Sequence, residues 1–247
     1  MFEWMAPAFA SLYKVTGWNF IVFYERYEYD RFIDGAMLSI GLILLCLVLS
    51  IVIGVLGAWA QGSRSRAVRW GMGAYIQGFR NTPPVVQLLF FYFGLGAFVP
   101  QVDAGGYYEP LVTAFGWAVI SLSIFGGAFN VEIFRAGLEA VPRATVEGAE
   151  SLGFSRLQIY AYVTLPLAFR FCLPALSNNL VSLAKTTSLA YVIAVPEMTY
   201  TLNQVWSDNV NVPEMMILLF LFYVVVVSLL SAFLGWVERR LALSGFG

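Results

Sequence analysis

Residues 35–63 read GAMLSIGLILLCLVLSIVIGVLGAWAQGS, with no charged side chain and a majority of apolar residues. A stretch of about 20 apolar residues is long enough to cross the hydrocarbon core of a bilayer as an α-helix. Three arginines, Arg64, Arg66 and Arg69, follow at once, as is typical of the cytoplasmic end of a span. This stretch therefore predicts a membrane-spanning helix.

The composition extends this interpretation to the whole chain. Hydrophobic residues make up 60% of the 247 residues and charged residues only 12%, whereas soluble domains carry about 25% charged residues. Because so few charges cannot cover a water-facing surface, lipid must be one of the solvents. The length allows roughly five or six spans of ~20 residues, too few for a typical one-chain transporter of two inverted halves. We therefore expect a partner subunit.

Four further apolar stretches predict four further spans. They cover about 70–100, 111–131, 167–195 and 215–237. The first of these is interrupted near its middle by Arg80-Asn81-Thr82-Pro83-Pro84, and the third contains Arg170 and Lys185. The predicted fold class is an all-α integral membrane protein with about five transmembrane helices.

Basic residues predict the orientation of these spans. Eight arginines lie in the segments after the first, third and fifth spans: Arg64, Arg66, Arg69, Arg135, Arg143, Arg156, Arg239 and Arg240. The intervening loops, 101–110 and 196–214, hold acidic residues and no Lys or Arg. The positive-inside rule assigns the arginine-rich side to the cytoplasm. With five spans the N-terminus is outside, together with Lys14, Arg26 and Arg31, and the C-terminus is cytoplasmic.

Several classes of chemistry are excluded by residue content. The chain has no histidine, and its two cysteines, Cys46 and Cys172, lie in apolar surroundings, which removes the usual haem ligands, zinc sets and Cys–His nucleophiles. The phosphate-binding pattern Gly-x-x-x-x-Gly-Lys-Ser/Thr does not occur. We therefore expect this chain not to be an enzyme, and any ATP hydrolysis to belong to a partner subunit. A net charge of −1 gives no indication of nucleic-acid binding.

The segment between the third and fourth predicted spans reads VPRATVEGAESLGFSRLQIYAYVTLP, residues 141–166. Its length suits two short helices, 145–152 and 155–163, since Gly153 interrupts the pattern and Ser155 is a favourable N-cap. The small residues Gly148 and Ala149 would let the first helix approach another protein closely. On the residues alone, an ordinary solvated loop is the other interpretation.

The spacing within this segment resembles the EAA loop of ABC importer permeases. The family pattern is Glu-Ala-Ala, three residues, Gly, nine residues and Ile-x-Leu-Pro. The matching residues here are Glu147, Gly148, Ala149, Gly153, Val163, Leu165 and Pro166. Gly148 replaces the first Ala and Val163 replaces Ile; both changes keep size and polarity, although Gly148 lowers the helix propensity.

Three other segments resemble the polar amino acid (histidine/glutamine/glutamate-type) permeases of the same family. They are FRNTPPVVQLLFFYFGLG at 79–96, VEIFRAGLEAVPRAT at 131–145 and LAKTTSLAYVIAVPEMT at 183–199. In the first of them Asn81 stands where the family commonly has Gly. Together with the EAA-like loop, these segments extend the resemblance over nearly the whole chain.

The resemblance implies a type I ABC importer permease fold in a bacterial inner membrane. It implies two ATPase subunits that bind ATP and Mg²⁺, a second permease subunit (identical or homologous) and an extracytoplasmic substrate-binding protein; this chain itself would hold no cofactor. The implied ATPase-coupling residues are Glu147, Gly148, Ala149, Gly153, Leu165 and Pro166. The expected organisation is an extracytoplasmic interfacial segment at 1–34, a transmembrane permease domain at 35–240 with its cytoplasmic coupling loop at 141–166, and a cytoplasmic tail at 241–247.

Polar residues within the spans are the candidates for a substrate path. A cation at mid-membrane costs about 2.5–3.5 kcal/mol on insertion scales, so Lys185 and Arg170 should face protein or water. We expect Arg170 to snorkel or to hold a loop, and Lys185 to pair with either a substrate carboxylate or an acidic side chain such as Glu132. The Pro-broken point of the second span is either part of a binding site or a kink that shapes the dimer interface. The full candidate set is Arg80, Asn81, Thr82, Gln87, Asn178, Lys185 and Thr186.

Two other roles are expected for polar residues, some of which belong to that set. Asn178, Asn179 and Gln87 are expected chiefly to hydrogen-bond between helices, a common use of amides in membranes. Glu197 follows Pro196 at the outer end of the fourth span and is a candidate contact for the binding protein.

Two functions remain to be compared. The first is an importer subunit for a polar or charged amino acid or a derivative; zwitterionic, acidic and basic amino acids, opines and compatible solutes all stay open as cargo. The second is a non-transporting membrane anchor of an oligomeric enzyme complex. That alternative explains the hydrophobicity but leaves the EAA spacing unexplained.

Overall fold

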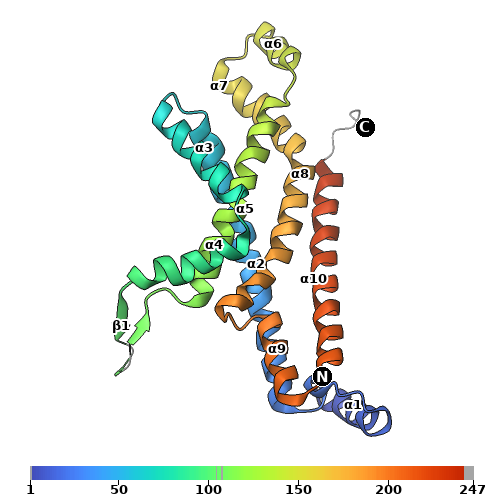
Figure 1. Cartoon of the computed structure of the whole chain (residues 1–247). Helices are drawn as coiled ribbons and strands as arrows, with labels where there is room; N and C mark the ends of the chain where they lie inside the picture. The colour runs from blue at the N-terminus through green and yellow to red at the C-terminus, as the bar shows by residue number, and fades with distance from the viewer. Residues whose placement is uncertain (1, 104, 107, 242–247) are drawn as a thin grey trace. The chain divides into compact units, whose positions relative to one another are not determined.

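The computed structural model describes residues 2–103, 105–106 and 108–241 and is mainly helical (Figure 1). In chain order the elements are α1 (Phe2–Thr16), the 3-10 helix η1 (Ile21–Phe23), α2 (Arg26–Gln61), α3 (Arg66–Arg80), α4 (Pro84–Leu89), the π-helix η2 (Phe90–Leu95), the 3-10 helix η3 (Gly96–Phe98), β1 (Gln101–Asp103), β2 (Tyr108–Pro110), α5 (Ala114–Glu139), α6 (Arg143–Ser151), α7 (Arg156–Ile159), the π-helix η4 (Tyr160–Thr164), α8 (Leu165–Thr186), the 3-10 helix η5 (Thr187–Ile193), α9 (Met198–Asn209) and α10 (Val212–Leu241). The predicted helical class is confirmed. One short antiparallel hairpin, in which Val102 pairs with Glu109, is the exception. Of the predicted tail at 241–247, only Leu241 lies within the described residues.

Four of the helical stretches are long and apolar enough to cross a bilayer. They are α2, α5, the run Arg156–Ile193 and α10. The predicted second span instead consists of α3 and a shorter apolar run, Pro84–Phe98. The break falls where it was expected, because Pro83 and Pro84 lack backbone N–H donors and cannot continue α3. Pro84 begins α4, where its fixed φ is favourable. The count of five spans therefore stays a prediction.

Three helices extend beyond the charge-free stretches. Helix α2 begins at Arg26 instead of Gly35, α5 continues to Glu139, and the fourth helical run begins at Arg156 instead of Leu167. Hydrocarbon restricts which side chains lie in the lipid, but it does not end a helix at the membrane surface. The added turns carry paired charges: Arg31 contacts Glu28 at 3.0 Å, and Arg135 contacts Glu132 and Glu139 at 3.3 and 3.4 Å. Such i,i+3 and i,i+4 pairs support exposed helix.

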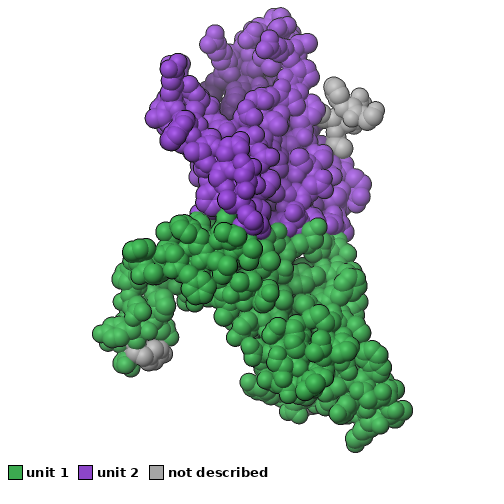
Figure 2. All heavy atoms as spheres, in the orientation of Figure 1, with its two compact units in different colours: residues 1–45, 85–121, 184–228 green, residues 46–84, 122–183, 229–247 purple. Residues whose placement is uncertain are grey.

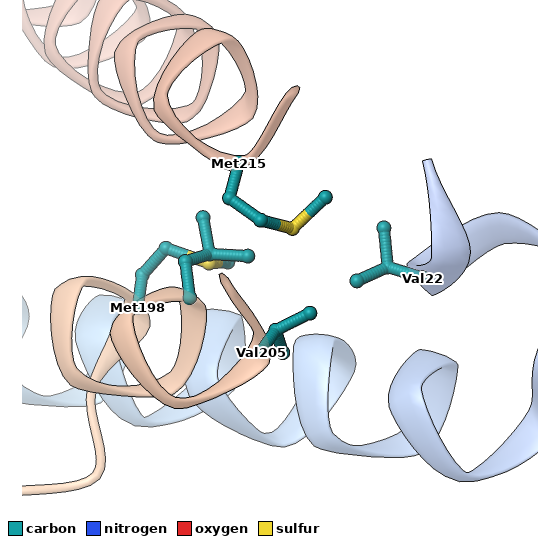
Figure 3. Close-up of a cluster of buried hydrophobic side chains, with 5 residues drawn as sticks. Val22, Met198, Val205 and Met215 are labelled. Atoms are coloured by element: carbon teal, nitrogen blue, oxygen red, sulfur yellow. The ribbon is translucent and has the colours of Figure 1, made fainter. Parts of the chain in front are cut away.

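The chain divides into two compact units (Figure 2). The first comprises residues 1–45, 85–121 and 184–228. Its core is a cluster of buried side chains from η1, α9 and α10: Val22, Met198, Leu202, Val205 and Met215. Figure 3 shows Val22, Met198, Val205 and Met215 of this cluster between these elements. Helix α2 packs closely on α9. A Cβ atom built at Gly35 would lie only 2.6 Å from Thr201 Oγ1, so the two helices leave no room for a side chain there.

Glu197 joins three helices of this first unit. Its carboxylate caps α9 by accepting from the Thr199 and Tyr200 N–H groups at 2.9 and 3.0 Å, and it accepts from the Tyr223 hydroxyl of α10 at 3.0 Å. The Ser39 hydroxyl of α2 lies 3.4 Å from the same carboxylate. Only 1% of Glu197 is exposed, so the expected contact with a binding protein is wrong. Burial raises the pKa of this carboxyl, and the hydrogen bonds it accepts oppose the shift.

The second unit comprises residues 46–84, 122–183 and 229–247, and a chain of polar side chains connects three of its helices. Asn179 of α8 donates to Asn130 Oδ1 at 2.8 Å and to the Gly126 carbonyl at 3.1 Å. Asn130 of α5 donates to Ser50 Oγ at 3.2 Å, and Ser50 of α2 donates to the Leu47 carbonyl at 2.8 Å. Asn130 and Ser50 are fully buried. We call this set of Ser50, Asn130 and Asn179 the polar ladder.

Glycines bring the backbones of these helices close enough for the polar ladder to form. A Cβ atom at Gly54 of α2 would overlap Asn130, and one at Gly137 of α5 would lie 2.7 Å from the Ala168 carbonyl of α8. Small residues at such positions are typical of helix interfaces in membranes. The predicted role of Asn179 in holding helices together is thereby confirmed.

The polar ladder can be tested at adjacent residues. We expect Asn179→Ala to lower the free energy of unfolding by about 1 kcal/mol, because Asn130 loses a partner where no water replaces it. Thermal unfolding of the detergent-solubilised protein measures this change.

Asn178→Ala is the matched control, because Asn178 is exposed and has no side-chain role in the ladder. It should leave the unfolding midpoint unchanged. Equal midpoints for both variants would contradict a stabilising role for the polar ladder.

Candidate functional site

The predicted coupling segment forms two helices joined by a tight turn. Helix α6 ends at Ser151, and Gly153 adopts a left-handed conformation with φ of 83°. The Gly153 N–H donates to the Glu150 carbonyl at 2.9 Å, and the Phe154 N–H donates to the Ala149 carbonyl at 3.2 Å. This pair of bonds is the Schellman arrangement, which satisfies the last carbonyls of a helix and favours Gly at this position. The turn predicted at Gly153 is confirmed. The positive φ of Gly153 and these two backbone bonds set the direction in which the chain leaves α6.

The second helix continues without interruption into the fourth apolar run. Ser155 caps α7 by accepting from the Gln158 N–H, while the Gln158 side chain accepts from the Ser155 N–H at 2.8 Å. This reciprocal capping box fixes the start of α7, as the N-cap prediction required. Helix α7 then passes through η4 into α8. Leu165 and Pro166 are the first two residues of α8, and the π-helical turn of η4 lies where the missing Pro166 N–H weakens the α-helical ladder.

The two small residues of the coupling segment face different directions on α6. Gly148 is exposed, and a Cβ atom placed on it would meet no atom within 4 Å. Ala149 is only 8% exposed and packs inward. Gly148 can therefore admit a partner surface, whereas Ala149 supports the segment from within. The expectation that both residues allow close approach of a partner stays a prediction. Gly148 has the space for it, whereas the helical step of 100° between the two residues turns Ala149 inward.

Apolar residues that the sequence interpretation missed surround the turn. Leu152 and Leu157 are each 78% exposed, and Phe154 is 40% exposed. Arg143, Glu147 and Glu150 are exposed on α6. Exposed leucines beside an open glycine, rimmed by charge, are typical of a protein contact rather than of a solvated loop. The signal in the sequence was the presence of Leu152 and Leu157 on either side of the turn at Gly153.

The predicted substrate-path residue Arg80 forms a second candidate site in the second unit. Its Nη1 atom lies 3.7 Å from Glu132 Oε2, and its guanidinium lies 5.2 Å from the centre of the Phe129 ring. These residues line a pocket of about 450 Å³ together with Ile133 and Phe171. Glu132 also contacts Arg135 at 3.3 Å and accepts from Gln61 at 3.3 Å. Glu132, expected as one possible partner of Lys185, thus has these partners in its own unit.

Asn81 and Thr82 form hydrogen bonds at the end of α3, where the prolines interrupt the helix. Asn81 Nδ2 donates to Gln77 Oε1 at 3.0 Å, and the Thr82 hydroxyl donates to the Gly78 carbonyl at 2.8 Å. Both bonds lie within α3 and the residues that follow it. The Thr82 bond satisfies a carbonyl that the proline break would otherwise leave open. Both bonds are local to the break and support the kink interpretation for these two residues.

The remaining candidates lie on three other helices. Gln87 is buried in α4, and Asn178 is exposed on α8. Lys185 is exposed in the last turn of α8, next to Thr186. In the part of the chain that the structure describes, no carboxylate lies within ion-pair distance of Lys185. Arg80, Asn81 and Thr82 are consecutive residues at the end of α3, and Lys185 and Thr186 are the last two residues of α8.

Comparisons with known proteins agree with this architecture. Residues 50–243 match the family described as binding-protein-dependent transport system inner membrane component. The chain is 32% identical over 209 residues to the glutamine transport system permease protein GlnP of Escherichia coli, covering 85% of this chain and 92% of that protein. It is 31% identical over 208 residues to the L-cystine transport system permease protein TcyB of Bacillus subtilis, covering 84% and 85%.

A solved structure of an amino acid ABC transporter with histidines matches with a TM-score of 0.75 and 29% identity, covering 94% of this chain and 98% of that one. These relatives do not favour a non-transporting anchor. By sequence and by fold, the chain belongs to the binding-protein-dependent transport system inner membrane components, the permease subunits of ABC importers.

Proposed function

We propose that this permease carries a polar amino acid, or a close derivative of one, into the cell. Support comes from the relatives, whose names specify glutamine and L-cystine, and from the structural neighbour described as an amino acid ABC transporter. Both named cargoes are zwitterions with a polar side chain. A substrate-binding protein outside the membrane would deliver the cargo.

The observation that carries the coupling role is the exposed face of α6. Gly148 has open space, Leu152 and Leu157 project from the turn, and Glu147 and Glu150 add charge. We infer that this face docks on an ATPase subunit. The ATPase would bind ATP and Mg²⁺, and this chain would supply a docking surface and no catalytic group.

The contacts of the coupling segment favour rigid transmission into the fourth apolar run. The Schellman turn fixes α6 to α7, and α7 continues through η4 into α8 with no flexible linker. A displacement of α6 would therefore move α8 with it as one rigid body. Rigid-body motion of this kind switches the access of a site between two sides of a membrane. In this proposal two ATPase subunits act on two permease subunits, identical or homologous.

The topology that this function requires places the α6–α7 turn in the cytoplasm. The arginines near the ends of α2, α5 and α10 support that assignment by the positive-inside rule. The N-terminal segment 1–34 would then lie outside, at the membrane interface. Its aromatic contacts, such as Phe9 with Phe23 at 4.7 Å between ring centres, are consistent with an interfacial segment.

The pocket beside Arg80 is the proposed point of substrate passage within this subunit. It offers a guanidinium from Arg80, a carboxylate from Glu132 and the aromatic side chains of Phe129 and Phe171. These groups match the carboxylate, the ammonium and the carbon skeleton of a zwitterionic amino acid. Arg80 and Glu132 would exchange their mutual contact for contacts with the cargo.

The coupling role predicts a severe effect of bulk at Gly148. Gly148→Arg should lower uptake by about tenfold or more, since losing ~1.4 kcal/mol of docking free energy weakens association tenfold. Transport of labelled amino acid into vesicles that contain the assembled transporter measures this effect.

Gly148→Ala is the matched control, because it adds one methyl group in open space and improves helix propensity. It should transport normally. Both variants should insert, and neither should unfold at a lower temperature than the wild type. Normal uptake by the Gly148→Arg variant would show that this face of α6 does not dock on the ATPase.

A second prediction concerns Arg80. Arg80→Gln should raise the KM of uptake about tenfold, because a charge-assisted hydrogen bond contributes ~1.5–3 kcal/mol. Lys185→Gln provides the comparison at the other candidate cation. A lower unfolding midpoint for Arg80→Gln, with an unchanged KM, would assign Arg80 a structural role only.

The topology predicts opposite accessibility for two exposed acidic positions. In a background without Cys46 and Cys172, Glu109→Cys should react with a membrane-impermeant maleimide in intact cells. Glu150→Cys should react only after the cells are opened. Labelling of Glu150→Cys in intact cells would refute the cytoplasmic assignment of the coupling segment.

A further inference from the structure

A large apolar cavity lies in the second unit. It shares Cys172 with the pocket beside Arg80 and includes Tyr160 and Leu165 of the coupling segment, but its other lining residues are its own. Its volume is about 920 Å³, within the ~300–1,000 Å³ typical of ligand pockets. Its walls come from the last turns of α2, the start of α3, the end of α5 and the η4–α8 junction. Representative lining residues are Val55, Trp59, Phe134, Leu138 and Phe169. None of the described side chains that line it is charged.

The cavity lies at the arginine-rich ends of membrane-spanning helices. Ser63, which lines it, is followed by Arg64, and Val68 lines it one residue before Arg69. Trp59 is 79% exposed at the cavity, and Tyr160 contributes the other aromatic side chain with a polar group. Trp and Tyr collect at the level of lipid headgroups. The cavity therefore extends from headgroup depth toward the hydrocarbon.

Arg69 is bonded at the Ser63 end of this cavity, which we call its mouth. Its Nη1 atom donates to the Ser63 carbonyl at 2.6 Å, which ties the guanidinium to a lining residue. A guanidinium has five N–H donors, so others remain for a ligand. In the described ranges, Arg64, Arg66 and Arg69 have no carboxylate within ion-pair distance. The mouth thus carries positive charge that the protein itself leaves uncompensated.

We propose that this cavity binds an anionic phospholipid. An acyl chain would occupy the space between Val55, Phe134 and Phe169, and the phosphate would lie against Arg69, with Arg64 and Arg66 nearby in sequence. A polar amino acid finds no charged partner on these walls, whereas a chain with an anionic head matches both the mainly apolar lining and the positive mouth. Basic pockets between membrane helices on the cytoplasmic side are suited to anionic lipid headgroups.

Lipid in this cavity would contact the helical segment that connects the α6–α7 turn to α8. Tyr160 belongs to η4, and Leu165, Ala168 and Phe169 belong to the first turns of α8. These residues connect the α6–α7 turn to the fourth apolar run. The lipid would fill the space beside that connection and so restrict its bending. The site itself does not depend on the identity of the transported cargo.

The test measures lipid binding by the purified, assembled transporter in detergent. Radiolabelled phosphatidylglycerol should bind more tightly than phosphatidylcholine, and inorganic phosphate should not displace it. Arg69→Gln should weaken phosphatidylglycerol binding about fivefold, the expected contribution of one basic residue at an anionic headgroup. Ala60→Phe, which places a ring at a lining position, should weaken the binding of both lipids.

Two control variants make the same kinds of substitution elsewhere in the second unit. Arg239→Gln removes a guanidinium of α10, and Ala232→Phe adds a ring at an exposed position of α10; both should bind phosphatidylglycerol like the wild type. Equal affinity for the two lipids, displacement by inorganic phosphate, or unchanged binding by Arg69→Gln would overturn the proposal. A change in subunit stoichiometry of Ala60→Phe with unchanged lipid binding would assign the cavity to a protein partner instead. If Ala60→Phe does not fold, the comparison of Arg69→Gln with Arg239→Gln still decides.

Discussion

A hydrocarbon environment contains no water that can satisfy a buried polar group, and this constraint governs how the helices of the second unit associate. Ser50, Asn130 and Asn179 are polar side chains that lie among mainly apolar residues of α2, α5 and α8. Each has its partner on a neighbouring helix or on a backbone carbonyl. The glycines at positions 54 and 137 bring the backbones close enough for these short side chains to reach. Close packing and polar pairing therefore depend on each other, since these short side chains reach their partners only where the helix backbones lie close together.

The same reasoning explains why the coupling segment is rigid. A loop between two spans has no need of structure if it only connects them. Here the turn at Gly153 satisfies the end of α6, and the Ser155–Gln158 box satisfies the start of α7. With both ends closed, little freedom remains between α6 and α8. The exposed residues Leu152 and Leu157 stay at the tip of this rigid turn, where a partner subunit can hold them.

Much of this architecture could be predicted from sequence. The apolar stretches, the Pro83-Pro84 break and the Gly153 turn each follow from a local property: transfer into hydrocarbon, loss of a backbone donor, or tolerance of positive φ. Helix ends were harder to predict, since α2 begins at Arg26 and α5 continues to Glu139. Charge shows where lipid ends, but paired charges let the helix continue into water. Glu197 was misjudged for a related reason, because its partners Ser39 and Tyr223 are distant in sequence.

By itself, the sequence determined that the chain is helical and membrane-bound, and it located the segment with EAA-type spacing, because composition and spacing are properties of the linear chain. Tertiary structure decided which side chains meet. It directed Gly148 outward and Ala149 inward, paired Arg80 with Glu132, and assembled the apolar cavity beside Ser63, to which Arg69 is bonded. These outcomes depend on how helices rotate and pack against one another. That rotation is set by contacts between residues far apart in the chain, which no local pattern encodes.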